Sequence, residues 1–154
     1  MELASRVGTG LVGLRDSGRP VLLATLGVPF DPKASAFAVD AAIETGEPLI
    51  VANVVELPPL GMSVAMGYDQ LPDPPDEAEA LRAPAELAHS LGAKVERLRV
   101  RSPRPIEALL QLTAERAPGL LVFGPDRQRL KGRTYRKAAG ALRRRASCLV
   151  WLAD

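Results

Sequence analysis

Basic side chains gather near the end of this chain, after a glycine that follows a short apolar run. The run spans residues 120–123, and Gly124 follows it directly. The cations after this glycine are Arg127, Arg129, Lys131, Arg133, Arg136 and Lys137. A glycine-containing loop between a strand and a helix attracts anions, because backbone N–H groups and the helix N-terminus both carry partial positive charge. The chemistry that this pattern predicts is the binding of an anion such as phosphate.

Three interpretations of these cations remain open. In the first, Arg and Lys side chains act with Gly132 and Thr134 to bind a nucleotide or another phosphorylated small ligand. In the second, the cations form a solvated face, and Arg143, Arg144 and Arg145 stabilise a helix C-terminus. In the third, the least favoured, they bind nucleic acid or another polyanion, but no recognised motif or stacking aromatics accompany them.

The charge of the chain is unevenly distributed. Residues 1–126 hold 11 basic and 17 acidic side chains, whereas residues 127–154 hold 9 basic and 1 acidic, so the net charge of +2 conceals a strongly positive C-terminal segment. No catalytic or metal-binding group of residues is apparent. His89 is the only histidine and lies on a predicted helix, away from the strand ends. The sequence gives no reason to expect an enzyme.

Composition predicts one globular domain. The chain has 154 residues, of which 47% are hydrophobic and 25% charged, and no apolar run approaches the ~18 residues that cross a bilayer. Glu2 and Arg6 stand where a secretory signal would be apolar. The single cysteine, Cys148, excludes an internal disulfide and fits a reducing compartment. We therefore expect a cytoplasmic protein that does not associate with membranes.

Apolar runs and helical periods predict five strands alternating with four helices. We expect strands over residues 20–26, 49–55, 94–101, 120–123 and 147–153. The helix over residues 33–45 is expected to direct Ala36, Val39 and Ile43 inward. The order predicts an α/β protein with a doubly wound, five-stranded parallel sheet and helices on both faces. Residues 1–18 are read as a loose N-terminal arm, residues 19–154 as the domain, and residues 56–76 as a long Pro-rich loop within it.

That loop has two interpretations. It is either a mobile connection or a flap over a ligand or partner, with Met62, Met66 and Tyr68 as its contact residues.

Two segments resemble the universal stress protein (UspA-like) family. The sequence PIEALLQLTAERAPGLLVFG roughly matches the family pattern P-x-E-A-I-L-x-x-A-x5-D-L-I-V-x-G, with Pro118-Gly119 replacing the usual Ala-Asp pair. Cys148-Leu149-Val150 is similar to the family's last strand. Gly124 matches the first glycine of G-x2-G-x9-G-[ST]. The resemblance covers about residues 19–153. It implies a Rossmann-like (adenine nucleotide alpha hydrolase-like) fold with strand order 3-2-1-4-5, and a role in the stress response.

The ligand motif departs from the family pattern at three places. Arg127 replaces the second glycine, Arg136-Lys137 or Lys137-Ala138 replace Gly-Ser or Gly-Thr, and Thr25-Leu26-Gly27 stands where ATP-binding members have an Asp. Asp31 is either a displaced equivalent of that Asp or the cap of the next helix. The candidate nucleotide or phosphate site is Thr25, Gly27, Asp31, Asn53, Gly124, Arg127, Gly132, Arg133, Thr134 and Lys137.

We expect a regulatory or binding module that is not a standard ATP binder. The first alternative is a protein that binds ATP, another adenine nucleotide or a cyclic nucleotide, with Arg and Lys replacing the glycines. The second is a polyanion-binding protein. The resemblance also implies a homodimer through the apolar last strand, at Cys148, Val150, Trp151 and Leu152. In the alternative interpretation, Trp151 is simply an intrachain core residue.

Overall fold

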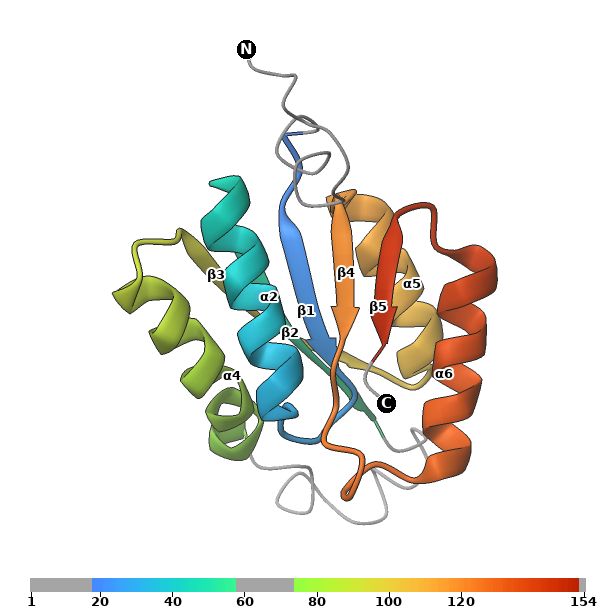
Figure 1. Cartoon of the computed structure of the whole chain (residues 1–154). Coiled ribbons are helices and arrows are strands. Elements are labelled where there is room, and N and C mark those ends of the chain that lie inside the picture. Colours follow the sequence, from blue (N-terminus) through green and yellow to red (C-terminus); the bar gives the residue numbers. More distant parts are fainter. Residues whose placement is uncertain (1–17, 58–73, 153–154) are drawn as a thin grey trace.

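A parallel β-sheet with helices on both faces forms the domain (Figure 1). The computed structural model describes residues 18–57 and 74–152, and of residues 74–76 only the backbone. The strands are β1 (Val21–Thr25), β2 (Leu49–Glu56), β3 (Val95–Ser102), β4 (Leu120–Phe123) and β5 (Leu149–Leu152). All neighbours pair in parallel, in the order β3-β2-β1-β4-β5, which confirms the predicted fold class and strand order. Most of the predicted arm and Pro-rich loop lies outside the described residues.

β1 is the central strand because its side chains are apolar on both faces, apart from Thr25 at its end. Every residue of β1 is fully buried. Val21 and Leu23 pack into the core on one face of the sheet, and Leu22 and Ala24 pack into the core on the other. A strand buried on both faces suits the middle of a parallel sheet. Helices therefore cover β1 on both sides.

Four helices supply the two covering layers. α2 (Pro32–Thr45) and α4 (Pro74–Ser90) cover one face, while α5 (Pro105–Arg116) and α6 (Gly132–Arg145) cover the other (Figure 1). Pro105 is at the first position of α5, as expected from its fixed φ and missing N–H. Within residues 18–57 and 74–152, no helix combines the length and the apolar run needed to cross a membrane.

The buried face of α2 differs from the expected one. Ala36 is exposed and Ile43 is 37% exposed, so the prediction that both point inward is wrong. The face that meets the sheet instead contains small residues, namely Ala34, Ser35, Ala38, Val39, Ala41, Ala42 and Thr45. Small side chains allow α2 to lie close to β1 and β4, and this close approach determines which face is buried. The larger Ile43 is left at the surface.

The two sheet edges differ in character. β3 carries charged side chains, which discourage pairing with another sheet edge, and this confirms its predicted edge position. β5, at the other edge, is short and apolar, and Leu149 is 56% exposed. Trp151 is half-buried and stacks on Phe37 of α2 with ring centroids 4.9 Å apart. Trp151 therefore has an intrachain partner, and the homodimer stays a prediction.

Candidate functional site

The loops after β1 and β4 meet at the point where the chain changes from one face of the sheet to the other. After β1 the chain enters α2, and after β4 it enters α6 on the opposite face. The amide of Asp31 donates to the carbonyl of Gly124 at 2.9 Å, and the amide of Asp126 donates to the carbonyl of Pro29 at 2.9 Å. Ligands of open α/β sheets bind at such a switch point.

Gly124 has a steric role at this switch point. A Cβ atom at Gly124 would lie 2.2 Å from the Cβ of Ala34, in the first turn of α2. Real Cβ atoms do not approach so closely, so any side chain at Gly124 would displace α2. The glycine that the family resemblance assigns to a ligand loop is therefore needed here for helix packing.

Asp31 is the N-cap of α2. Its side-chain oxygen Oδ2 accepts a hydrogen bond from the amide of Ala34 at 3.1 Å, and its backbone is extended, as is usual for a cap. Of the two interpretations of Asp31, the structure shows the helix cap. The Asp of ATP-binding members has no carboxylate counterpart at the matching place, because Leu26 is apolar there and only 7% exposed.

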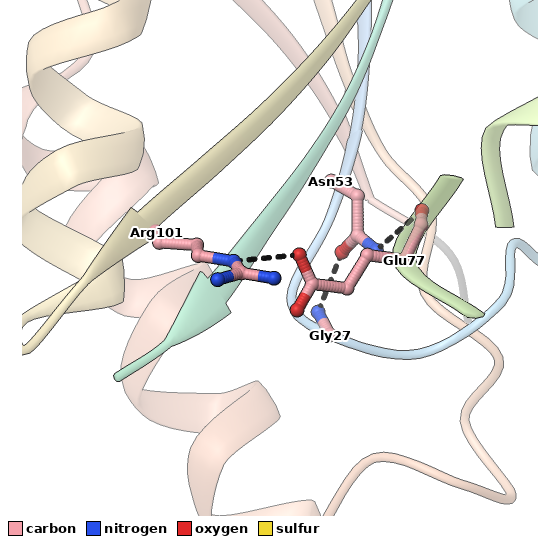
Figure 2. Close-up of polar contacts among 4 residues, drawn as sticks. All are labelled: Gly27, Asn53, Glu77 and Arg101. Atoms are coloured by element: carbon pink, nitrogen blue, oxygen red, sulfur yellow. Dashed lines mark hydrogen bonds and ion pairs between the residues drawn. The ribbon is translucent and has the colours of Figure 1, made fainter. Parts of the chain in front are cut away.

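Asn53, at the end of β2, ties the β1 loop to α4. Its Oδ1 accepts from the amide of Gly27 at 2.8 Å, and its Nδ2 donates to the carbonyl of Glu77 at 3.3 Å (Figure 2). Gly27 has a φ of +74°, in the left-handed region that favours glycine. Thr25 steadies the same loop by donating from its hydroxyl to the carbonyl of Val28 at 2.9 Å. Three of the candidate residues thus shape one loop.

Glu77 and Arg101 form a pair that sequence reasoning missed. Arg101 Nε donates to Glu77 Oε1 at 2.9 Å, and Glu77 is 5% exposed (Figure 2). The other carboxylate oxygen, Oε2, is buried and has no hydrogen-bond partner among the described residues. The two residues lie on α4 and β3, so no local spacing in the sequence connects them. Only the parallel pairing of β3 with β2 brings Arg101 to the carboxyl end of the sheet.

A cavity of about 880 Å³, here called the switch-point cavity, lies beside these residues. Its walls come from the β1 loop, the start of α2, the end of β2 and α4. The lining residues are Gly27, Val28, Pro29, Phe30, Pro32, Ser35, Asn53, Val55, Glu77, Glu79, Ala80, Ala83, Pro84, Leu87 and Arg129. This mixture of apolar walls with a few polar groups is typical of small-molecule sites, as is the volume.

The basic loop between β4 and α6 does not line this cavity with several cations. Arg129 is the one basic residue among the lining residues, and its Nε lies 3.7 Å from Asp126 Oδ2. The guanidinium of Arg127 stacks over the ring of Tyr135, 3.5 Å from its centroid. Tyr135 in turn stacks on Phe123. The residue that replaces the second motif glycine is thus held against an aromatic ring of α6.

The basic loop between β4 and α6 ends at Lys131. α6 begins at Gly132, so Arg136 and Lys137 lie inside the helix rather than in a phosphate-binding loop. Lys131, at the N-cap position, makes no capping hydrogen bond through its side chain.

The structure therefore divides eight of the ten candidate residues into two groups. Gly27 and Asn53 line the switch-point cavity, while Thr25, Asp31 and Gly124 support its loops. Arg133, Thr134 and Lys137 line a second cavity, between α5 and α6 on the opposite face of the sheet. Neither cavity is lined by Arg127 or Gly132.

The described residues contain no group of three or more His, Cys, Asp or Glu side chains that could hold a metal ion. His89 is exposed in the last turn of α4. Cys148 is half-buried, and burial raises the pKa of its thiol, which disfavours the reactive thiolate.

An open, doubly wound parallel sheet with a ligand-sized cavity at its switch point places this protein among the Rossmann-like α/β proteins. Within that class, the chain belongs to the universal stress protein family, whose sequence profile matches residues 18–153. This confirms the resemblance inferred from the sequence. No curated protein matches the chain.

Solved structures share the fold at low sequence identity. A universal stress protein in complex with cAMP is 21% identical, with a TM-score of 0.59, over 88% of this chain and 96% of that chain. The universal stress protein from Archaeoglobus fulgidus in complex with dAMP is 20% identical, with a TM-score of 0.60, over 88% and 98%. A family member from Arabidopsis thaliana with AMP bound is 12% identical, with a TM-score of 0.54, over 87% and 90%.

Proposed function

We propose that this universal stress protein is a regulatory binding module without catalytic activity, which binds an adenine nucleoside or nucleoside monophosphate rather than ATP. The switch-point cavity, of about 880 Å³, is the observation that carries this proposal. Its apolar walls suit a base, and Asn53, Ser35 and the backbone of the β1 loop offer polar groups to orient it. The similar structures described with cAMP, dAMP and AMP support the choice of ligand class.

The electrostatics of the cavity argue against a triphosphate. Arg129 is the only cation among the lining residues, and the two lining carboxylates, Glu77 and Glu79, are each paired with an arginine outside the lining, Arg101 and Arg82. A triphosphate carries several negative charges, and a single lining cation leaves most of them without a partner. α6 begins at Gly132, so Arg136 and Lys137 lie inside the helix, and Arg127 stands in place of a glycine that would allow close backbone approach.

The test is direct titration of the purified protein with adenosine, AMP, cAMP and ATP by isothermal titration calorimetry. Mass spectrometry of denatured protein would identify any nucleotide that is retained through purification. We expect AMP or adenosine to bind more tightly than ATP. At a ligand concentration of a hundred times Kd, the free energy of unfolding should rise by about 2.7 kcal/mol.

A matched pair of variants locates the binding to the cavity. Ala83 lines the cavity and is exposed, so Ala83→Trp should obstruct the cavity without disturbing the core. Ala78 is exposed on the same helix but does not line the cavity, which makes Ala78→Trp the control. Equal binding by both variants, tighter binding of ATP than of AMP, or no binding of any of these ligands would contradict the proposal.

We also propose that the protein is a homodimer through β5, as the family resemblance implies. The exposed, apolar Leu149 on this edge strand supports the proposal, since an uncovered apolar edge invites pairing. Leu149→Lys should shift the mass measured by light scattering toward that of a monomer. Leu91→Lys is the control, because Leu91 is similarly exposed, at 53%, but follows α4. A cytoplasmic location and a role in stress stay predictions.

A further inference from the structure

A second cavity, here called the α5/α6 groove, lies between the first turn of α5 and the length of α6. Its volume is about 590 Å³. The lining residues are Glu56, Pro103, Arg104, Pro105, Ile106, Glu107, Arg133, Thr134, Lys137, Ala141, Arg144 and Arg145. Five of these residues are cations and two are carboxylates. The groove is on the opposite face of the sheet from the switch-point cavity and shares no lining residue with it.

The sequence of α6 places its cations along one side of the helix. Arg133, Lys137 and Arg144 are separated by whole numbers of turns, with Ala141 between them at the same helical spacing. Ala141 is small and buried, so the middle of the row is hollow while charged side chains stand on either side. Cations that serve only to keep a helix face solvated do not require a hollow between them. The spacing therefore gives the groove both its concave shape and its charge.

One of the two carboxylates is already engaged. Glu107 accepts two hydrogen bonds from Arg145, at 2.6 and 3.1 Å. The hydrogen bond from Arg145 lowers the pKa of the Glu107 carboxyl, and the positive charges of Arg145, Arg104 and Lys137 lower it further. Glu107 thus holds Arg145 in position and stays ionised. The effect of Arg104 and Lys137 on its pKa shows that these cations lie near the same carboxylate.

The remaining cations have no such partner within residues 18–57 and 74–152. Arg104, Arg133, Lys137 and Arg144 make no ion pair with any carboxylate of the described residues, and Glu56 is the only other acidic residue in the lining. Like charges that converge on a concave surface focus a positive potential there. Arginine adds planar, bidentate hydrogen bonding that matches phosphate oxygens.

We propose that the α5/α6 groove binds a small, multiply phosphorylated anion, with Arg104, Arg133, Lys137 and Arg144 as its phosphate-binding residues. A single phosphate would engage only part of the row, because Arg133 and Arg144 lie three turns apart along α6. A nucleic acid fits less well. No aromatic side chain lines the groove to stack on a base, and Glu56 and Glu107 would repel a continuous phosphate backbone.

The probe that tests this proposal is inorganic tripolyphosphate, titrated into the full chain by calorimetry at low and at physiological salt. We expect one site per chain, with weaker binding at the higher salt because ions screen exposed charges. Arg133→Gln with Lys137→Gln removes two lining cations. Each cation that hydrogen-bonds a phosphate should contribute about tenfold in affinity, so the double variant should bind about a hundredfold more weakly.

The control is on the same helix. Arg136 and Arg143 are exposed on α6 but do not line the groove, so Arg136→Gln with Arg143→Gln removes the same charge from outside it. This control should change the affinity less than threefold. Circular dichroism melts of both double variants establish that they are folded.

Three results would overturn the proposal. Equal losses in the two double variants would mean that net charge alone attracts the probe. Tighter binding of a single-stranded oligonucleotide than of tripolyphosphate would mean that the cations form a nucleic-acid surface. No binding of tripolyphosphate at low salt would mean that they form only a solvated face.

Discussion

Replacing Gly124 by alanine tests whether this glycine is present for helix packing or for contact with a ligand. The added Cβ would lie 2.2 Å from the Cβ of Ala34. Carbon atoms in contact are normally at least ~3.5 Å apart, so α2 must retreat by about 1.3 Å. Both atoms are fixed to backbone, one after β4 and one in α2, so no side-chain rotation can relieve the clash.

The cost follows from this geometry. Overpacking a core by one or a few methyl groups usually costs about 1–3 kcal/mol, and a contact that no rotamer change can relieve belongs at the upper end. We expect Gly124→Ala to lower the free energy of unfolding by about 3 kcal/mol. The melting temperature should fall by about 10 °C for a domain of this size.

A double-mutant cycle with Ala34 isolates the contact. Ala34→Gly removes the opposing Cβ and should itself cost about 1–2 kcal/mol, from lower helix propensity and the loss of a buried methyl group. In the double variant the clash is absent. The two costs should therefore not add, and the coupling energy should be about 2 kcal/mol in the stabilising direction.

Urea unfolding monitored by circular dichroism measures all four proteins. Additive costs, to within about 0.5 kcal/mol, would refute the steric explanation. Unchanged stability of Gly124→Ala would refute it as well. If that stable variant also lost affinity for a nucleotide, Gly124 would instead have the ligand-contacting role that the family motif implies.

Three further predictions concern the polar contacts. Asp31→Ala removes the side-chain cap of α2 and should cost about 1 kcal/mol in urea unfolding, whereas no change would mean that the cap is dispensable. Arg101→Met leaves the buried carboxylate of Glu77 without its cation and should cost about 3–5 kcal/mol in urea unfolding; a loss below about 1 kcal/mol would contradict this. The pKa of Glu107 is lowered in the folded state by Arg145, so its stabilising contribution is complete above the unfolded pKa and is lost as the pH falls through the folded pKa. In Glu107→Gln, the free energy of unfolding should therefore fall less as the pH is lowered than it does in the unchanged protein. The same fall in both proteins would refute a stabilising role for the pair of Glu107 with Arg145.

Much of the fold could be predicted because its signals are local. The apolar run of β1 predicted a strand buried on both faces, and the charged sequence of β3 predicted an edge. Pro105 predicted the start of α5. The buried face of α2 was predicted wrongly, since Ile43 is larger than the alanines that face the sheet. A large apolar side chain such as Ile43 is expected to point inward. The short distance between α2 and the sheet instead favours small residues on the buried face.

The candidate site was harder to predict, because residues that are close in sequence lie on opposite faces of the sheet once the chain has passed the switch point. Gly124 and Arg133 were assigned to one site, yet Gly124 packs against α2 and Arg133 faces a groove on the other side of the sheet. The pairing of Glu77 with Arg101 depends on the register of β3 against β2 and on the position of α4. No spacing along the chain carries that information.

The stacking of Trp151 on Phe37 gives this chain a built-in optical reporter. It has a single tryptophan, so the tryptophan emission, excited selectively at long wavelength, comes from one place, where an edge strand meets α2. The same α2 begins at the rim of the switch-point cavity, with Pro32 and Ser35 among the lining residues. A shift of α2 when that cavity fills would change the ring stacking and hence the emission intensity. Covering of the half-buried indole by another chain would instead move the emission to shorter wavelength. If both events occur, unlabelled protein would report ligand entry and assembly as two separable spectral changes.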